Sequence, residues 1–226
     1  MPVKKKPSVN GVHRRTWRTK KASNTRFRIL ESTLDCLVEI GFTNTSIATI
    51  AAKAGLSRGA VQFHFPTKSA AMEAVTNHIL QRRLDVYRAD MAKILPSEDF
   101  LEHALTAYWK QVTRPEFVAQ QEIALAARTD ARLAEVLGLA YREYVARSRE
   151  PFLAEFPAWK ASRDKYEMGA NFAQYLIEGM AWGYTNRYLT DDAVGAMLDK
   201  LRAVVDALLE ERPTTTARRG ASRKTR

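Results

Sequence analysis

The stretch Thr45–Lys68, TSIATIAAKAGLSRGAVQFHFPTK, decides the fold of this chain. It predicts two short helices joined by a tight turn. In the first helix, apolar residues at helical spacing give one narrow apolar face, formed by Ile47, Ile50, Ala51 and Ala54. Thr45 or Ser46 can cap this helix, because a hydroxyl accepts from the free N–H groups of a first turn. Gly55 ends it, because glycine adopts the left-handed conformation without a Cβ clash.

The second helix of the stretch leaves one face free. Ser57 caps it, Pro66 stops it, and its apolar stripe consists of Ala60, Val61 and Phe65. A helix of about eight residues is not stable alone in water, so the rest of a domain must hold it. The free face carries Arg58, Gly59, Gln62, Phe63 and His64. Small and polar groups on such a face allow a helix to enter a major groove and reach base edges.

These residues resemble the DNA-binding domain of the TetR family of bacterial transcription regulators. The resemblance covers about Thr25 to Val75, and the matching residues are Gly41-Phe42, Thr45-Ser46-Ile47, Ile50-Ala51, Ala54-Gly55-Leu56-Ser57-Arg58-Gly59 and Phe63-His64-Phe65-Pro66-Thr67-Lys68. Family members often carry a tyrosine at the position of Gln62 and a charged residue at the position of Ala48. The first departure removes a phosphate contact and offers an amide that can read adenine. The second removes a base contact.

The resemblance and the free helix face together imply a set of DNA-binding residues: Thr45, Ser46, Ser57, Arg58, Gly59, Ala60, Gln62, Phe63, His64 and Lys68. Thr45 and Ser46 are expected to offer the N-terminus of the first helix to a phosphate. Arg58, Gly59, Ala60 and Gln62 are expected to face bases, and Phe63, His64 and Lys68 to position the helix on the backbone. Core packing is the alternative for Phe63 and His64, and it is the expectation for Phe65.

Charge is distributed unevenly along the 226 residues, whose formal net charge is +11. Residues 1–72 hold 13 Lys or Arg against 3 acids, residues 73–211 hold 17 against 22, and residues 212–226 hold 6 against none. This pattern is typical of a nucleic-acid-binding part joined to a part with another task. The single cysteine, Cys36, excludes an internal disulfide and fits the cytoplasm, and we expect it to be buried. No apolar run is long enough to span a membrane.

The chain is predicted to be all-α with about nine helices. Residues 1–23 are expected to form a disordered basic arm, which either is solvated or follows phosphates through Arg14, Arg15, Arg18, Lys20 and Lys21. Residues 24–72 form the helix-turn-helix domain, 73–211 a helical effector-binding and dimerisation domain, and 212–226 a second disordered basic tail. Helices are expected at about 24–40, 67–95, 97–113, 115–128, 130–149, 162–188 and 191–210, with Pro151 breaking the chain after the fifth.

The last two predicted helices, at about 162–188 and 192–210, carry clean apolar stripes. Such a pair can form a four-helix seam with the same pair of a second subunit. Members of the TetR family dimerise there, so the resemblance implies a homodimer. Internal packing alone is the alternative.

The resemblance also implies a small-molecule effector, bound within the C-terminal domain, that releases a repressor from a palindromic operator. The candidate lining residues are Trp109, Phe117, Gln121, Glu122, Tyr144, Phe172 and Tyr175. For each of them plain core packing is the alternative. A second hypothesis is a weakly specific DNA-binding protein that uses its basic tails. An enzyme is disfavoured, because the sequence has no phosphate-binding glycine loop, no metal cluster and no nucleophile elbow. No cofactor and no metal are expected.

Overall fold

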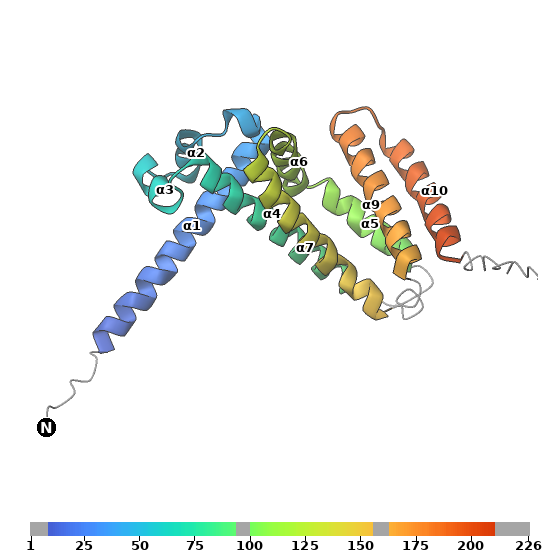
Figure 1. The fold of residues 1–226 in the computed structure, drawn as a ribbon, viewed down its shortest axis with the longest axis horizontal. Helices are drawn as coiled ribbons and strands as arrows, with labels where there is room; N and C mark the ends of the chain where they lie inside the picture. The colour runs from blue at the N-terminus through green and yellow to red at the C-terminus, as the bar shows by residue number, and fades with distance from the viewer. Residues whose placement is uncertain (1–8, 94–99, 156–162, 211–226) are drawn as a thin grey trace, which may run out of the picture. The chain divides into compact units, whose positions relative to one another are not determined.

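The computed structural model describes residues 9–93, 100–155 and 163–210, and every regular element in these ranges is an α-helix. The all-α fold predicted from the sequence is therefore confirmed (Figure 1). The chain divides into two compact units, Met1–Glu155 and Phe156–Arg226, which are considered separately here. The predicted tail at 212–226 lies outside the described residues.

The first helix, α1 (Val9–Asn44), begins much earlier than predicted. Residues 9–23 are helical, so the prediction of a disordered arm is wrong from Val9 onward. The last proline before the core is Pro7, and the Lys, Arg and Thr residues that follow are compatible with a helix. The basic side chains predicted to follow phosphates lie on residues whose side chains are not described.

The predicted end of this helix holds at Gly41, where the backbone leaves the helical conformation. Gly41 has φ 75° and ψ 171°, and one short helical turn follows before α2. This left-handed φ is a region that residues with a Cβ adopt rarely. The kink turns the chain toward the helix-turn-helix motif.

The two motif helices are α2 (Ile47–Ala54) and α3 (Arg58–His64), as the sequence predicts. In α2 the Ser46 hydroxyl accepts from the Thr49 N–H, and the Thr49 hydroxyl accepts from the Ser46 N–H in return. Gly55 ends α2 with φ 60°. Ser57 caps α3, and its hydroxyl accepts from the Ala60 N–H at 3.1 Å.

The core beneath the motif continues into the following helices. Residues of α1, α2 and α3 pack with the start of α4 (Lys68–Met91) and with α6 (Pro115–Ala127), and the buried cluster includes Leu37, Ile50, Val61, Phe65, Met72, Val75, Ala119 and Ile123. The core therefore does not end at residue 72, where the sequence places a domain boundary. Cys36 is buried in this cluster as expected, and burial raises the pKa of its thiol, which keeps it in the unreactive protonated form.

The rest of the first unit is built from α4, α5 (Phe100–Val112), α6 and α7 (Ala131–Glu155). The sequence predicts that Pro151 breaks the last of these, but α7 continues through it to Glu155. Pro151 has no N–H to donate to the carbonyl of Arg147. The Arg88 guanidinium donates to that carbonyl instead, at 3.2 Å, so the lost helical bond is replaced by a side chain of α4.

A buried arginine lies between these helices. Arg83 of α4 is 1% exposed, and its guanidinium donates to the amide oxygens of Gln111 and Gln120. The same guanidinium lies 5.1 Å from the ring centroid of Phe117 and 4.9 Å from that of Tyr144. The Tyr144 hydroxyl donates to Gln111 at 2.6 Å. This polar centre ties α4, α5, α6 and α7 together.

In the described part of the second unit, residues 163–210, two helices pack on each other, α9 (Arg163–Thr185) and α10 (Asp191–Glu210). Their positions agree with the last two predicted helices. The buried residues of this pair include Tyr166, Ala173, Ile177, Met180, Val194, Leu201 and Val205.

Candidate nucleic-acid interface

The polar face of α3 is exposed to solvent because the apolar residues on its other side are buried in the core. Val61 is 0% exposed and the capping Phe65 is 2% exposed, and both belong to the core beneath the motif. The opposite face carries Arg58, Gly59 and Gln62, which are all exposed. The residues predicted to face bases therefore lie together on one free surface, with Ala60 half-buried at its edge.

Phe63 lies on this free surface and not in the core. It is 84% exposed, and its ring meets the half-buried ring of His64 edge-to-face at 5.3 Å. An aromatic side chain this exposed on a small helix is the kind of residue that a DNA backbone or a thymine methyl group covers. Phe65 is buried, as its apolar spacing predicts.

Thr45 does not lie where a phosphate can reach its hydroxyl. It is 1% exposed, and its Oγ1 donates to the carbonyl of Gly41 at 2.7 Å. The side chain therefore closes the turn after Gly41, and the predicted approach of the helix N-terminus to a phosphate stays a prediction. Ser46 is half-buried and caps α2, so its hydroxyl holds the first turn of that helix.

Lys68, which is predicted to position the motif on the DNA backbone, makes hydrogen bonds within the protein. Its Nζ donates to the carbonyl of Phe42 at 2.7 Å and to that of Thr43 at 3.4 Å, and it lies 4.4 Å from the centroid of the Phe42 ring. Partial burial lowers the pKa of the Lys68 ammonium. The side chain joins the start of α4 to the end of α1, which is a structural task.

Lys68→Met should therefore lower the stability of the protein, and its effect on DNA affinity should be the smaller of the two. Loss of the charged hydrogen bonds to the two carbonyls is expected to lower the free energy of unfolding by about 1 kcal/mol. Urea unfolding followed by circular dichroism measures this change. Lys53→Met is the matched control, because Lys53 makes an exposed pair with Glu39 and should change stability little. If Lys68→Met instead keeps wild-type stability but binds all DNA sequences more weakly, Lys68 acts as a phosphate contact.

Two arginines of α1 lie beside the motif and are missing from the predicted set. The Arg26 guanidinium lies 4.4 Å from the centroid of the Phe65 ring, and Arg28 donates to the carbonyl of Gly55 at 3.5 Å. Both are exposed. Their proximity arises from helix packing, and the only signal in the sequence is that they are the last basic residues before the core of α1.

The predicted effector residues belong to both units and differ in their exposure. Phe117 and Tyr144 are buried against Arg83, as core packing requires, and Trp109 and Gln121 are half-buried. The Glu122 carboxylate accepts a hydrogen bond from the Phe42 N–H at 2.8 Å, so it is directed toward the motif and not toward a ligand. Phe172 and Tyr175 belong to the second unit, where they are 44% and 64% exposed on α9.

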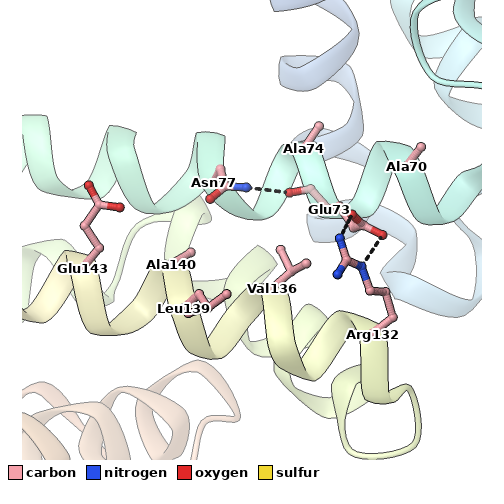
Figure 2. A pocket seen from close by; sticks show the side chains of 9 residues that line it. All are labelled: Ala70, Glu73, Ala74, Asn77, Arg132, Val136, Leu139, Ala140 and Glu143. Carbon is pink, nitrogen blue, oxygen red and sulfur yellow. Dashed lines mark hydrogen bonds and ion pairs between the residues drawn. The ribbon is translucent and has the colours of Figure 1, made fainter.

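A surface groove of about 590 Å³ lies between α4 and α7 (Figure 2). Its lining residues are Ala70, Glu73, Ala74, Asn77, Arg132, Val136, Leu139, Ala140 and Glu143. Figure 2 shows the Glu73–Arg132 ion pair bridging one end of the groove, with Oε–N distances of 3.3 Å. A smaller hollow of about 190 Å³ adjoins Tyr144, the one predicted effector residue that borders either space.

Groups that hold metal ions are also missing from the described residues. No cluster of three or more His, Cys, Asp or Glu side chains in these ranges has metal-binding geometry. His78 bonds to the Glu31 carboxylate at 2.5 Å. Burial opposes the charged form of Glu31, but the hydrogen bonds from Arg82 and His78 outweigh it and lower the pKa of this carboxyl.

None of the described helices has the length and apolarity that crossing a lipid bilayer requires.

Comparison with known proteins gives a consistent result. Residues 29–75 match the family model described as bacterial regulatory proteins, tetR family. An uncharacterized HTH-type transcriptional regulator of Mycobacterium tuberculosis is 32% identical over 120 residues, which are 53% of this chain and 62% of that protein. The HTH-type transcriptional regulator CymR of Pseudomonas putida is 28% identical over 122 residues, 54% of this chain and 60% of CymR. The chain thus spans less than two thirds of the curated relatives it matches.

Likeness to solved structures extends further along the chain. The structure of Salmonella enterica GusR aligns with a TM-score of 0.60 and 25% identity, over 83% of this chain and 96% of GusR. The fold of the helices after the motif is therefore shared with a solved structure, although the sequence similarity to the curated relatives covers only about half of the chain.

Proposed function

Because the chain belongs to the TetR family of bacterial transcriptional regulators, we propose that it binds a palindromic DNA operator as a homodimer and is released by a small molecule. Its curated relatives are named HTH-type transcriptional regulators, which supports a DNA-binding regulator and not an enzyme. The finer proposal is that it represses transcription in the cytoplasm by excluding polymerase from a promoter that overlaps the operator. The observation that carries it is the free polar face of α3.

The chemistry of that face suits base readout. Arg58 offers a guanidinium that can bond guanine, and Gln62 offers an amide whose paired donor and acceptor match adenine. Gly59 has open space at the position of a Cβ, so α3 can approach the floor of a major groove closely. Exposed Arg26 and Arg28 add positive charge beside the helix.

The homodimer is supported by an apolar stripe on α9. Met168, Phe172, Tyr175 and Trp182 are 64%, 44%, 64% and 55% exposed and recur at helical spacing on one face, with the small exposed Gly179 among them. A monomeric protein rarely exposes so many large apolar side chains in one patch. On α10 the exposed residues include Gly195, Ala196, Ala203, Val204 and Ala207, which allow a second helix pair to approach closely.

Release by a ligand follows from linkage. An effector that prefers the conformation with wrongly spaced α3 helices weakens DNA binding by the ratio of its two affinities. DNA weakens effector binding by the same factor. The buried centre around Arg83, with Phe117 and Tyr144 on its faces, links four helices of the first unit, and displacement of any one of them disturbs the others.

Gln62→Ala should lower discrimination between operator variants while leaving affinity for random DNA unchanged. Loss of a bidentate amide–adenine contact is expected to reduce the preference for the correct base by about 1–3 kcal/mol. Operators are first selected from random-sequence duplexes, and dissociation constants are then measured at fixed salt for single-base variants. A variant that discriminates as well as the wild type would show that Gln62 does not read a base.

A weakly specific DNA-binding protein is the second candidate, because residues 1–23 and 212–226 are strongly basic. Competition by random DNA for the selected operator separates the two. A specificity ratio near one at physiological salt favours the second candidate, and a ratio of about a thousand or more supports a regulator.

A further inference from the structure

Phe42 is held from two sides by side chains of distant helices. Its N–H donates to the Glu122 carboxylate of α6 at 2.8 Å, and its carbonyl accepts from the Lys68 ammonium of α4 at 2.7 Å. Phe42 is the first residue after the kink at Gly41. The corner that leads from α1 into the motif is thus fastened to two helices that follow the motif, α4 and α6.

The kink brings the Glu122 carboxylate into contact with the backbone. A Cβ at Gly41 would lie 3.1 Å from Glu122 Oε2, closer than most real Cβ contacts, and φ 75° already disfavours any other residue. Because Gly41 has no Cβ, the Glu122 carboxylate can occupy this space. The hydrogen bond spans 80 positions of sequence.

A second polar link joins α1 to α6 along the same side of α4. The Arg82 guanidinium bonds to the Glu31 carboxylate of α1 and, through Nε, to the buried Glu116 carboxylate of α6 at 2.6 Å. Between the two links α1 packs directly on α6, where Ala119 and Ile123 belong to the core beneath the motif. The α1–α2 corner therefore cannot change its orientation without a change at α6.

We propose that Glu122 is a positioning residue for operator binding, because its hydrogen bond to the Phe42 N–H sets the orientation in which α6 holds α2 and α3. This inference rests on the proposed function, since orientation matters only where two copies of α3 must match two half-sites.

The Glu122 carboxylate does more than provide a hydrogen-bond partner for one backbone N–H. The Phe42 N–H is only partly buried, and water could accept from it at little cost. A charged acceptor from another helix instead makes the bond short, directional and about twice as strong as a neutral one. A strong bond is what the contact needs if it fixes the orientation of α2 and α3 relative to α6.

The test measures binding to a series of operators whose two half-sites are moved apart or together by one and two base pairs. Full-length wild type is expected to prefer one spacing sharply. Glu122→Ala should bind the best spacing about tenfold more weakly and lose most of the preference. Glu122→Gln keeps an acceptor oxygen but loses the charge, and it should retain part of the preference. Glu135→Ala removes an equivalent charge from an exposed pair on α7 and should behave as wild type.

Two results would overturn the inference. One is a Glu122→Ala profile with the same optimum and sharpness as wild type. The other is a loss of the same factor at every spacing together with a lower unfolding temperature, which marks general destabilisation. If the alanine variant does not fold, Glu122→Asp decides, because it keeps the charge but withdraws the oxygen, and an unchanged profile would then overturn the inference. A wild type without any preferred spacing would instead refute the proposed function.

Discussion

Gly59→Glu should abolish operator binding without disturbing the fold. Open space surrounds the position of a Cβ at Gly59, and the backbone there is ordinary helix, so a side chain costs nothing in the free protein. Glutamate has a higher helix propensity than glycine and suits the first turn of a helix. We therefore expect thermal stability equal to or slightly above that of the wild type.

The same side chain is incompatible with DNA in the proposed complex. It would place a carboxylate against base edges and phosphates at the point where α3 approaches most closely. Affinity for the operator is expected to fall at least about 100-fold, because a buried charge without a partner costs several kcal/mol. Fluorescence anisotropy with a selected operator measures the loss, and circular dichroism measures the retained fold.

Two matched variants make the result specific. Gly59→Ala adds only a methyl group and should bind within a few-fold of the wild type. Ala134→Glu places the same acid on an exposed position of α7 and should not affect binding. Operator affinity of Gly59→Glu within threefold of the wild type would contradict the proposed placement of α3 in the groove.

The double substitution Phe172→Asp with Tyr175→Asp should convert the proposed dimer into monomers. Both residues are exposed on α9, so their replacement removes little packing within their own unit. Four acids brought together at a two-fold seam would repel one another in an apolar contact. The dimer is expected to dissociate at micromolar concentration, as sedimentation velocity will show.

Operator binding should fall with the dimer. One α3 alone reads one half-site, and loss of the linked second half-site is expected to cost about 100-fold or more in affinity. Leu139→Asp is the control, because it replaces an exposed apolar residue of α7 in the same way. A monomeric double variant that still binds the full operator with wild-type affinity would refute the two-copy readout.

The sequence predicts the helices of the motif well because local chemistry determines them. Ser46, Gly55, Ser57 and Thr67 are cap residues whose effect is confined to one helical turn, and each lies at a helix boundary in the structure. The exposed face of α3 also follows from local periodicity. Such signals need no knowledge of the tertiary fold.

What the sequence does not reveal are contacts made by distant partners. Lys68 and Glu122 are polar residues of helices, and their spacing is compatible with surface contacts. Their bonds to the backbone of Phe42 come from other helices, which no local pattern reveals. Pro151 is similar, because the replacement bond to the Arg147 carbonyl comes from Arg88, 59 positions earlier.

The way α3 is attached has a consequence for how regulators of this kind diversify. Val61 and Phe65 provide the buried anchorage of this segment, whereas Arg58, Gln62 and Phe63 contribute almost nothing to the interior. Mutations at the three outward positions can therefore accumulate without loss of foldedness. If α3 reads bases as proposed, a gene duplicate could acquire a new target sequence by a few such changes, while the helices outside α3 stayed intact.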